Sequence, residues 1–522
     1  MKKLLLLVTF LALNHSLLFS QAPSWVWAKS AGGSFVNIFS ICADQAGNSY
    51  ITGYFNGASV TLGSFTLTNA GSYDMFVAKY DPDGNVLWAR SAGGNNSDDG
   101  FGIAVDAAGN VYVGGSFQSS SITFGSTTLT LTGTISFYLV KYDPNGSVIW
   151  VKSPTGGAVN SGDARVAVDH MGNAYLSGCF STSTFVFDTI TLNSTAGGGN
   201  NFYIAKYTPN GKVLWAKTAD AAGNGNGECQ GIVTDKNDNV YINGYNLGSK
   251  QIFGSDTLNQ IGNYDAFTVK YDKAGNVKWA KNFGGSGGTG NVTPNAITVD
   301  TAGNVYDVGY FGAASASFGS TSLSNIGGGY AYFIAKYDTA GNPLWAQSES
   351  GGGSGATYEY GTGVAVDANN QVYATSFYTS DSIAIGNFTV YSTNVNNHSN
   401  ADGFLVKYDE AGHILWAYGF EKERNAAANA IAIDNGNIYL TGSFSSDTLT
   451  FGTNPLPISH TYTHGFEELR WGPPRGLNCR MVVKRLSGIF RKLSSLCKYC
   501  RKLFYFHLIC SSIPGSAGLN QP

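Results

Sequence analysis

The stretch KYDPDGNVLW, residues 79–88, decides the fold, because close variants of it recur along the whole chain. In six copies a Lys-Tyr pair and a tight turn lead to a tryptophan, and one more tryptophan stands near the amino terminus. About sixty to seventy residues separate successive members of the set Trp27, Trp88, Trp150, Trp215, Trp279, Trp345 and Trp416. Self-similarity at a fixed long period predicts a stack of equivalent units that bury their faces against one another.

A second block, Asp-x-x-Gly-Asn-x-Tyr, repeats in step with the first, as at residues 106–112. Within the unit 100–153, short apolar runs at 102–105, 110–117, 137–142 and 148–152 alternate with turns, and a more polar excursion surrounds Phe124. Four antiparallel strands in each unit predict one blade of a β-propeller. The aromatic side chains of the second strand are expected to pack between blades, and its interior glycine to mark a bulge or a close backbone approach.

The two ends of the repeat region complement each other. The first unit begins with only its tryptophan strand, residues 24–29, and the last ends after two strands, near residue 455. Joining these pieces predicts a seven-bladed, all-β propeller over residues 24–455 whose last blade is shared between the chain ends, which removes open sheet edges. The repeat lacks a third strand in that blade, so the closing blade is expected to be defective.

Composition limits the function classes. Gly makes up 68 of the 522 residues and only 12% are charged, which suits short strands and tight turns. The net charge of −3 argues against a nucleic-acid binder. Residues 1–20, with Lys2, Lys3 and an apolar run at 4–13, predict a secretory signal peptide and a secreted or cell-surface location.

The segment 105–112, together with Lys141-Tyr142-Asp143 and Trp150, resembles the SBBP-type bacterial β-propeller repeats, and the resemblance extends over about residues 24–455. It implies a secreted or surface propeller of the kind found in Bacteroidetes, and it implies no established activity. The first hairpin of each unit is also similar to NHL repeats.

The second block begins with an aspartate, and its Asp-x-x-Gly-Asn pattern superficially resembles a calcium-binding loop. These aspartates are Asp44, Asp106, Asp169, Asp235, Asp300, Asp367 and Asp434. The pattern lacks the alternating oxygen ligands and the distal Glu of such a loop, so a hairpin turn is the favoured interpretation. No cofactor is predicted, although calcium remains an alternative at the channel mouth.

The best candidate site is positional. The loop that enters the first strand of a unit carries an acid at a similar offset in four units: Asp99, Asp163, Glu228 and Glu359. Because the first strand of a blade lines the axis, these carboxylates are expected to converge at one mouth of the channel. There they would suit a cation or a basic or hydroxylated ligand. Solvated loop acids are the alternative interpretation.

Three functional hypotheses follow. The first is a non-enzymatic binding scaffold for a glycan or protein, acting as a monomer with no transmembrane span in the propeller. The second is an NHL-like propeller hydrolase or lyase that uses the channel-mouth carboxylates, and the third is a purely structural surface protein. Neither a nucleophile elbow nor a phosphate-binding loop is present in the sequence.

The tail, residues 456–522, breaks the pattern. Residues 1–460 hold 21 basic and 32 acidic residues, whereas 461–522 hold 10 basic and 2 acidic. Three interpretations stay open: a zinc site around Cys497, Cys500, His507 and Cys510, a basic amphipathic helix at a membrane surface, and a non-native or frameshifted sequence. The pair His460 and His464 has a spacing that could chelate a metal on a helix, but exposed loop histidines are the favoured interpretation. The three cysteines of the repeats are expected to be isolated thiols.

Overall fold

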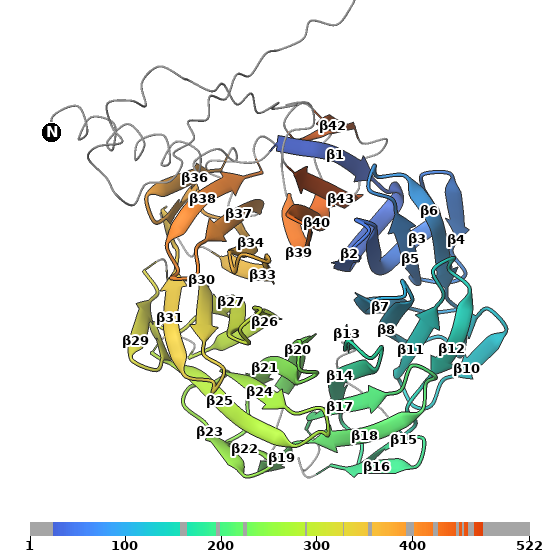
Figure 1. The fold of residues 1–522 in the computed structure, drawn as a ribbon, viewed down its shortest axis with the longest axis horizontal. Coiled ribbons are helices and arrows are strands. Elements are labelled where there is room, and N and C mark those ends of the chain that lie inside the picture. Colours follow the sequence, from blue (N-terminus) through green and yellow to red (C-terminus); the bar gives the residue numbers. More distant parts are fainter. Residues whose placement is uncertain are drawn as a thin grey trace, which may run out of the picture. The chain divides into compact units, whose positions relative to one another are not determined.

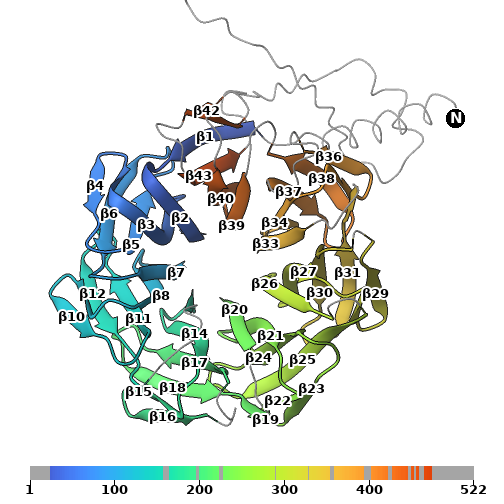
Figure 2. The same cartoon turned by 180° about the vertical axis from the view of Figure 1, so that it is seen from behind.

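The computed structural model describes residues 24–156, 164–194, 199–222, 227–287, 290–326, 328–352, 358–392, 401–420, 426–444, 448–451, 454–457 and 464–472. Every regular element in these ranges is a β-strand. Antiparallel sheets follow one another around a central space, as Figure 1 shows along the axis and Figure 2 shows from behind. The predicted all-β propeller class is therefore confirmed. Within the described ranges no helix is long and apolar enough to cross a membrane.

Six blades are each built from one continuous stretch of chain, with the strands in order from the axis outward. The first contains β2 (Gly32–Ala43), β3 (Ser49–Leu62), β5 (Asp74–Tyr80) and β6 (Val86–Ala92), with β4 (Phe65–Thr68) paired to β3. The second contains β7 (Asp98–Val105), β8 (Val111–Phe117), β11 (Ser136–Tyr142) and β12 (Val148–Lys152). The third contains β13 (Arg165–Val168), β14 (Ala174–Phe180), β17 (Asn201–Tyr207) and β18 (Val213–Thr218).

The other three continuous blades repeat this order. The fourth contains β20 (Gly227–Thr234), β21 (Val240–Asn246), β24 (Asp265–Tyr271) and β25 (Val277–Ser286). The fifth contains β26 (Val292–Val299), β27 (Val305–Phe311), β30 (Ala331–Tyr337) and β31 (Pro343–Ser348). The sixth contains β33 (Glu359–Val366), β34 (Val372–Tyr378), β37 (Asp402–Tyr408) and β38 (Ile414–Gly419).

A further four-stranded sheet joins both ends of the described chain, and we call it the chain-end sheet. Its order from the axis is β39 (Ala427–Asp434), β40 (Asn437–Phe444), β43 (His464–Gly472) and β1 (Ser24–Ser30). Strand β43 pairs antiparallel with both β40 and β1, so the third-strand gap that the repeat pattern predicted is filled. The sheet thus uses residues past 455. Residues 473–522, with the cysteines of the proposed zinc site, lie outside the described residues, as do the signal segment and His460.

The polar excursion of each unit forms a short hairpin on the outside of the ring. These hairpins are β9 (Ser121–Phe124) with β10 (Thr127–Thr130), β15 (Thr184–Phe187) with β16 (Ile190–Asn193), β22 (Lys250–Phe253) with β23 (Asp256–Asn259), β28 (Ser315–Phe318) with β29 (Thr321–Ser324), β35 (Ser382–Ile385) with β36 (Phe388–Tyr391), and β41 (Thr448–Phe451) with β42 (Asn454–Pro457). Three of them pair with the end of the preceding unit, through β19 (Asp220–Ala222), the last residues of β25, and β32 (Ser350–Gly352). Neighbouring units are therefore hydrogen-bonded at the rim.

The hydrophobic core lies between neighbouring sheets. In one cluster Tyr112 and Leu139 of the second blade pack with Val166 and Leu176 of the third. The middle strands β8 and β11 are buried along their whole length because each of their faces meets a neighbouring sheet. This explains why the repeat fills these strands with aromatic and β-branched residues rather than with an alternating polar pattern.

Six of the repeated tryptophans tie the outer strand of one unit to a turn of the next. In each, the indole Nε1 donates to a turn carbonyl at 2.9–3.2 Å, as from Trp88 to Pro144 O. The ring lies against the turn glycine, and a Cβ added at Gly146 would come within 2.7 Å of the Trp88 ring. The glycine and the tryptophan of the repeat therefore contact each other between successive units.

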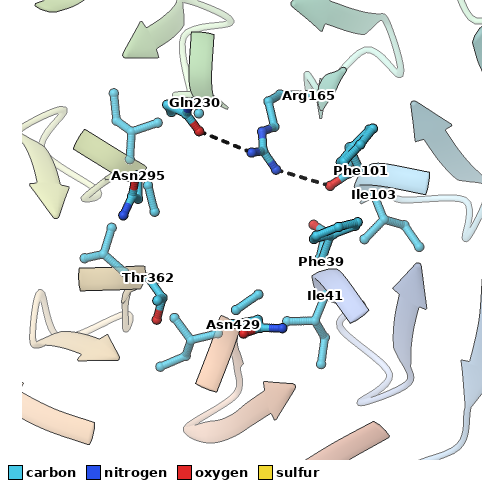
Figure 3. Close-up of a pocket in the computed structure, with 18 of the residues that line it drawn as sticks. Phe39, Ile41, Phe101, Ile103, Arg165, Gln230, Asn295, Thr362 and Asn429 are labelled. Atoms are coloured by element: carbon cyan, nitrogen blue, oxygen red, sulfur yellow. Dashed lines mark hydrogen bonds between the residues drawn. The ribbon is translucent and has the colours of Figure 1, made fainter. Parts of the chain in front are cut away.

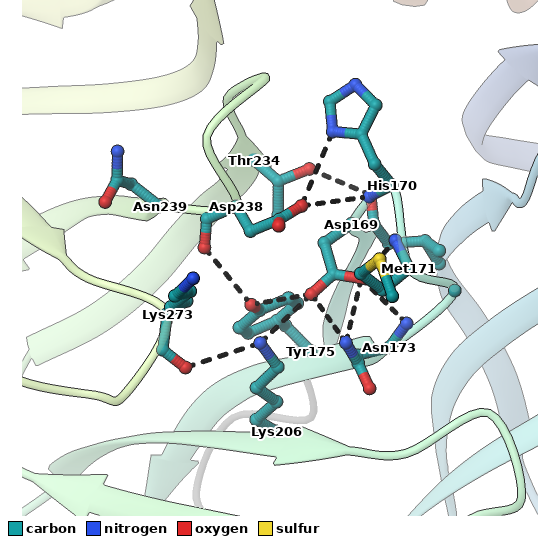
Figure 4. A network of polar contacts seen from close by, with 12 residues as sticks. Asp169, His170, Met171, Asn173, Tyr175, Lys206, Thr234, Asp238, Asn239 and Lys273 are labelled. Carbon is teal, nitrogen blue, oxygen red and sulfur yellow. Dashed lines mark hydrogen bonds and ion pairs between the residues drawn. The ribbon is translucent and has the colours of Figure 1, made fainter.

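The aspartate of the second block organises a hairpin turn, as Figure 4 shows for Asp169. Its Oδ1 accepts the amides of Met171 and Asn173 at 3.0 and 2.8 Å. Its Oδ2 accepts the Tyr175 hydroxyl at 3.1 Å and lies 3.0 Å from the ammonium of Lys206. The carboxylate oxygens are thus already engaged within the fold. The hairpin interpretation is confirmed over the calcium loop.

The Lys-Tyr pair of the first block completes this network. The Lys206 ammonium lies 4.8 Å from the centroid of the Tyr175 ring and donates to the Lys273 carbonyl of the next unit at 3.4 Å. Burial acts to raise the pKa of Asp169, but hydrogen bonds from Asn173 and Lys206 bring it below its ordinary value. The two repeated blocks therefore form one polar cluster in each unit.

Candidate functional site

The innermost strands of the six blades and of the chain-end sheet enclose a central cavity of about 650 Å³ (Figure 3). A β-bulge in each of these strands except β13 adds one residue, and its side chain lines the cavity. The bulge residues are Phe39, Phe101, Gln230, Asn295, Thr362 and Asn429. In β13 the side chain of Arg165 lines the cavity instead. The bulges turn one residue per unit toward the axis, while the flanking residues keep packing between sheets.

One side of the cavity is apolar. The rings of Phe39 and Phe101 lie with centroids 4.9 Å apart, and Ile41 and Ile103 line the wall beside them (Figure 3). These residues belong to the first two blades. A ligand in the cavity would meet a hydrophobic surface on this side.

The neighbouring part of the wall is charged and polar. Arg165 donates from Nη1 to the Phe101 carbonyl and from Nη2 to Oε1 of Gln230, both at 3.4 Å (Figure 3). Gln230 in turn donates from Nε2 to the carboxylate of Glu228 at 3.0 Å. The guanidinium is therefore oriented by groups of the blades on both sides of its own.

The remaining bulge residues bind the sheet that follows. Asn295 Nδ2 donates to the Gly361 carbonyl at 2.7 Å, and Thr362 Oγ1 donates to the Ala428 carbonyl at 2.6 Å. Asn429 Nδ2 donates to Ile38 O at 3.0 Å and so links the chain-end sheet to the first blade. The cavity wall thus also holds the ring closed.

Replacing Asn429 by alanine is expected to lower the free energy of unfolding by about 1–2 kcal/mol, because the Ile38 carbonyl loses a partly buried donor. Chemical denaturation measures the change. The control variant Asn282→Ala removes an exposed hydrogen bond of 2.7 Å from Asn282 Nδ2 to the Asn259 carbonyl. It is expected to lower the free energy of unfolding by less than about 0.5 kcal/mol. Equal losses in the two variants would contradict a role of Asn429 in closure.

The four predicted acids do not occupy one position. Asp99 pairs with Ser116 and Glu228 with Tyr245, at equivalent places in β7 and β20. Glu359 pairs with Tyr378 one residue earlier in the repeat, and its side chain is buried at 1% exposure. A shift of one residue turns a strand side chain to the opposite face. The expected common offset therefore holds for Asp99 and Glu228 but not for Glu359, whereas Asp163 lies outside the described residues.

Asp99 and Glu228, which we call the rim acids after the place predicted for them, lie beside tyrosines. Burial raises the pKa of Tyr54, and the Asp99 carboxylate of the next blade adds to the increase. Burial also raises the pKa of Tyr245, which gives a hydrogen bond to Glu228. The two carboxylates thus sit among aromatic hydroxyls rather than among metal ligands. Within the described ranges, no group of three or more His, Cys, Asp or Glu side chains is placed to hold a metal ion.

His170 and His413 lie in turns and His464 begins strand β43, and none of the three lines the cavity. His170 Nδ1 is 3.5 Å from Asp238, and His413 Nδ1 is 2.9 Å from Asp409. Of the described residues that line the cavity, Arg165 alone has an ionisable side chain. The arrangement suits the orientation of a polar ligand better than proton transfer, because a guanidinium stays protonated in proteins.

The cavity residues were missed by sequence reasoning, although a signal exists. The bulge residue stands five positions before the repeated turn aspartate, as Asn295 does before Asp300. In the six units with a bulge this position carries Phe, Gln, Asn or Thr, and a small residue (Gly, Ala or Ser) follows it. A variable side chain before a repeated small residue is therefore the sequence signal of the position that lines the cavity.

The chain was compared with known proteins. The family model described as a beta-propeller repeat, SBBP, matches residues 87–116. An uncharacterized WD repeat-containing protein of Acanthamoeba polyphaga mimivirus is 25% identical in an alignment that covers 82% of this chain and 36% of that protein. The chain thus spans only 36% of the length of this curated relative.

Solved structures with a similar arrangement include the polysaccharide lyase Uly1, with a TM-score of 0.41 and 8% identity over 85% of this chain and 90% of that chain. The WD40 beta propeller domain of Doa1 gives 0.37 and 9% over 85% and 97%. A protein of unknown function from Bacteroides caccae gives 0.32 and 10% over 67% and 92%. With the sheets described above, the repeat match shows that this chain is a beta-propeller repeat protein with an SBBP repeat at residues 87–116.

Proposed function

We propose that this protein is a non-enzymatic binding scaffold, secreted or held at the cell surface, whose glycan or protein ligand enters the central cavity. The observation that carries the proposal is the set of bulge residues. Six units place Phe, Gln, Asn or Thr at one equivalent position, and all of these side chains face one cavity of about 650 Å³. A rigid wall with a few convergent polar groups is the usual form of a binding site.

The chain-end sheet acts, in this proposal, as the seventh blade. Its inner strand β39 contributes Asn429 to the cavity wall, and its outer strand β1 comes from the start of the described chain. Pairing the two ends of the chain in one sheet would hold the cavity in a fixed shape without a disulfide. Cys42, Cys179 and Cys229 form no disulfide in the described structure.

The test uses the rim acids. The double variant Asp99→Ala/Glu228→Ala is expected to weaken ligand binding at least about tenfold, because it removes both carboxylates and the acceptor of Gln230 and Tyr245. Candidate ligands are oligosaccharides of defined charge and a random peptide library, with binding read by calorimetry and by the shift in Tm. Asp83→Ala, which removes an exposed acid in an outer turn, serves as the matched control.

Three outcomes would contradict the proposal or the part of it that places the rim acids in the site. Turnover of a bound oligosaccharide that disappears in the double variant would instead indicate the hydrolase or lyase of the second hypothesis. Binding that the double variant leaves unchanged would remove the rim acids from the site. A protein whose Tm responds to no ligand would fit a purely structural surface role.

A further inference from the structure

Four tyrosines of the fifth and sixth blades form a cluster at the edge of the cavity, and we call them the tyrosine rim: Tyr310, Tyr330, Tyr358 and Tyr360. Ring centroids lie 4.4 Å apart for Tyr310 and Tyr360, 5.1 Å for Tyr310 and Tyr330, and 5.7 Å for Tyr330 and Tyr358. Tyr360 also stacks at 4.9 Å on Phe377, which lines the cavity. The cluster is thus continuous with the cavity wall.

The outer part of the tyrosine rim consists of two nearly parallel rings, those of Tyr358 and Tyr360. Tyr358 and Tyr360 are two residues apart, and their ring planes differ by only 13° with centroids 6.4 Å apart. Tyr358 is 40% exposed. The ring of Tyr310 packs too closely on Tyr330 and Tyr360 for a ligand group to enter between them. A ligand would therefore contact the solvent-facing sides of the rings. Two nearly parallel rings with their hydroxyl groups offer an apolar surface and polar edges together.

Carboxylates accompany these rings. Glu228 accepts a hydrogen bond from Tyr245, which stacks on Tyr264 at 5.3 Å in the blade next to the tyrosine rim. The same carboxylate lies close enough to add to the raised pKa of Tyr310, after the larger effect of burial. Aromatic faces, carboxylates and the amides of Gln230 and Asn295 therefore border one edge of the cavity.

Resting on the proposed function, we propose that the tyrosine rim is a stacking subsite for the pyranose rings of a neutral oligosaccharide. A pyranose has an apolar C–H face, which packs on an aromatic ring, and equatorial hydroxyl groups that bind carboxylate and amide groups. Tyrosine provides such contact at low entropic cost because it has few rotatable bonds.

Charge favours a neutral sugar over a uronate. Residues 1–460 carry 32 acidic against 21 basic residues, and the Glu228 carboxylate accepts hydrogen bonds from Tyr245 and from the cavity residue Gln230. A uronate chain that reached the tyrosine rim would bring its carboxylates beside Glu228. Like charges at that distance disfavour binding. Arg165 lies in another blade and already donates to Phe101 O and Gln230.

The experiment measures binding of neutral gluco- and manno-oligosaccharides and of oligogalacturonate to the full chain by calorimetry. Tyr358→Ala is expected to weaken neutral-sugar binding roughly tenfold, and Tyr358→Phe is expected to bind within about threefold of the wild type, because stacking depends on the ring. Tyr391→Ala removes another exposed tyrosine, 70% exposed on the outer hairpin strand β36, and is the matched control with unchanged affinity. Tm is measured for every variant to show that the fold is retained.

The outcomes separate this inference from the proposed function. Neutral-sugar binding that Asp99→Ala/Glu228→Ala abolishes but Tyr358→Ala leaves intact overturns the tyrosine rim and keeps the cavity site. If the protein binds oligogalacturonate more tightly than the neutral oligosaccharides, the assignment of a neutral sugar is wrong, but the cavity site stands. If a peptide binds in a manner that depends on the rim acids and no sugar binds, the subsite fails while the binding scaffold stands. If no probe binds, both proposals fail.

Discussion

Replacing Trp88 by alanine is expected to lower the free energy of unfolding by about 3–5 kcal/mol, the usual cost of removing a buried aromatic side chain. Trp88 is only 5% exposed, and its ring packs against Gly146 of the next unit. The substitution removes that contact and also the hydrogen bond to Pro144 O at 3.0 Å. Because the contact joins two blades, the loss should appear in the unfolding of the whole ring, measured by chemical denaturation.

Two companion variants separate packing from hydrogen bonding. Trp88→Phe keeps a ring but removes the indole N–H, so it is expected to lose clearly less than Trp88→Ala. Leu87→Ala alters the neighbouring residue, which is 48% exposed, and is expected to change stability by less than about 1 kcal/mol. A Trp88→Ala protein as stable as Leu87→Ala would show that the repeated tryptophan does not hold successive units together.

Much of the fold could be predicted from the sequence because the repeated residues make the same contacts between successive units. The turn glycine and the tryptophan recur together since each ring packs on the glycine of the following turn, as Trp88 does on Gly146. The interior glycine of the second strand has a similar cause. A Cβ at Gly115 would lie 2.0 Å from the Asp99 carbonyl across the bulge. The expectation of a close backbone approach is confirmed.

The site was harder to predict because it depends on register rather than on composition. Asp99 and Glu359 stand near the start of equivalent strands, yet Asp99 is partly exposed and Glu359 is buried at 1% exposure. Because side chains alternate between the two faces of a strand, an error of one residue in the predicted position places a side chain on the wrong face. The bulges add a second difficulty, since an extra residue in the inner strand reverses the alternation at Asn295 and its equivalents.

Asp307 is expected to make the stability of the protein depend on pH. It is 2% exposed and takes the place that Ile51 and Val113 occupy in other units. Asn243 donates to its Oδ1 at 2.9 Å and Thr268 donates to its Oδ2. Burial raises the pKa of Asp307 to about 7, although the hydrogen bonds from Thr268 and Asn243 oppose the increase.

The sign of the effect follows from the two pKa values. The unfolded chain releases this proton near its ordinary pKa of 3.8, whereas the folded chain keeps it up to about 7. In that window the folded state binds more protons, so stability falls as pH rises, by about 1.4 kcal/mol per unit and about 4 kcal/mol in all. Above about pH 7 the contribution is constant. The buried Glu349, with a pKa raised to about 7, acts in the same direction.

Asp307→Asn isolates this contribution, since an amide does not ionise and can still accept from Asn243 and donate to Thr268. The variant is expected to match the wild type near pH 4 and to exceed its free energy of unfolding by about 2–4 kcal/mol near pH 8. Denaturation at both pH values measures the difference, and Asp83→Asn at an exposed turn is expected to leave the pH dependence unchanged. If Asp307→Asn instead lowers the free energy of unfolding by a similar amount at both pH values, Asp307 is ionised in the folded protein. The raised pKa would then be wrong, because an ionised Asp307 would need a compensating positive charge among the groups packed around it.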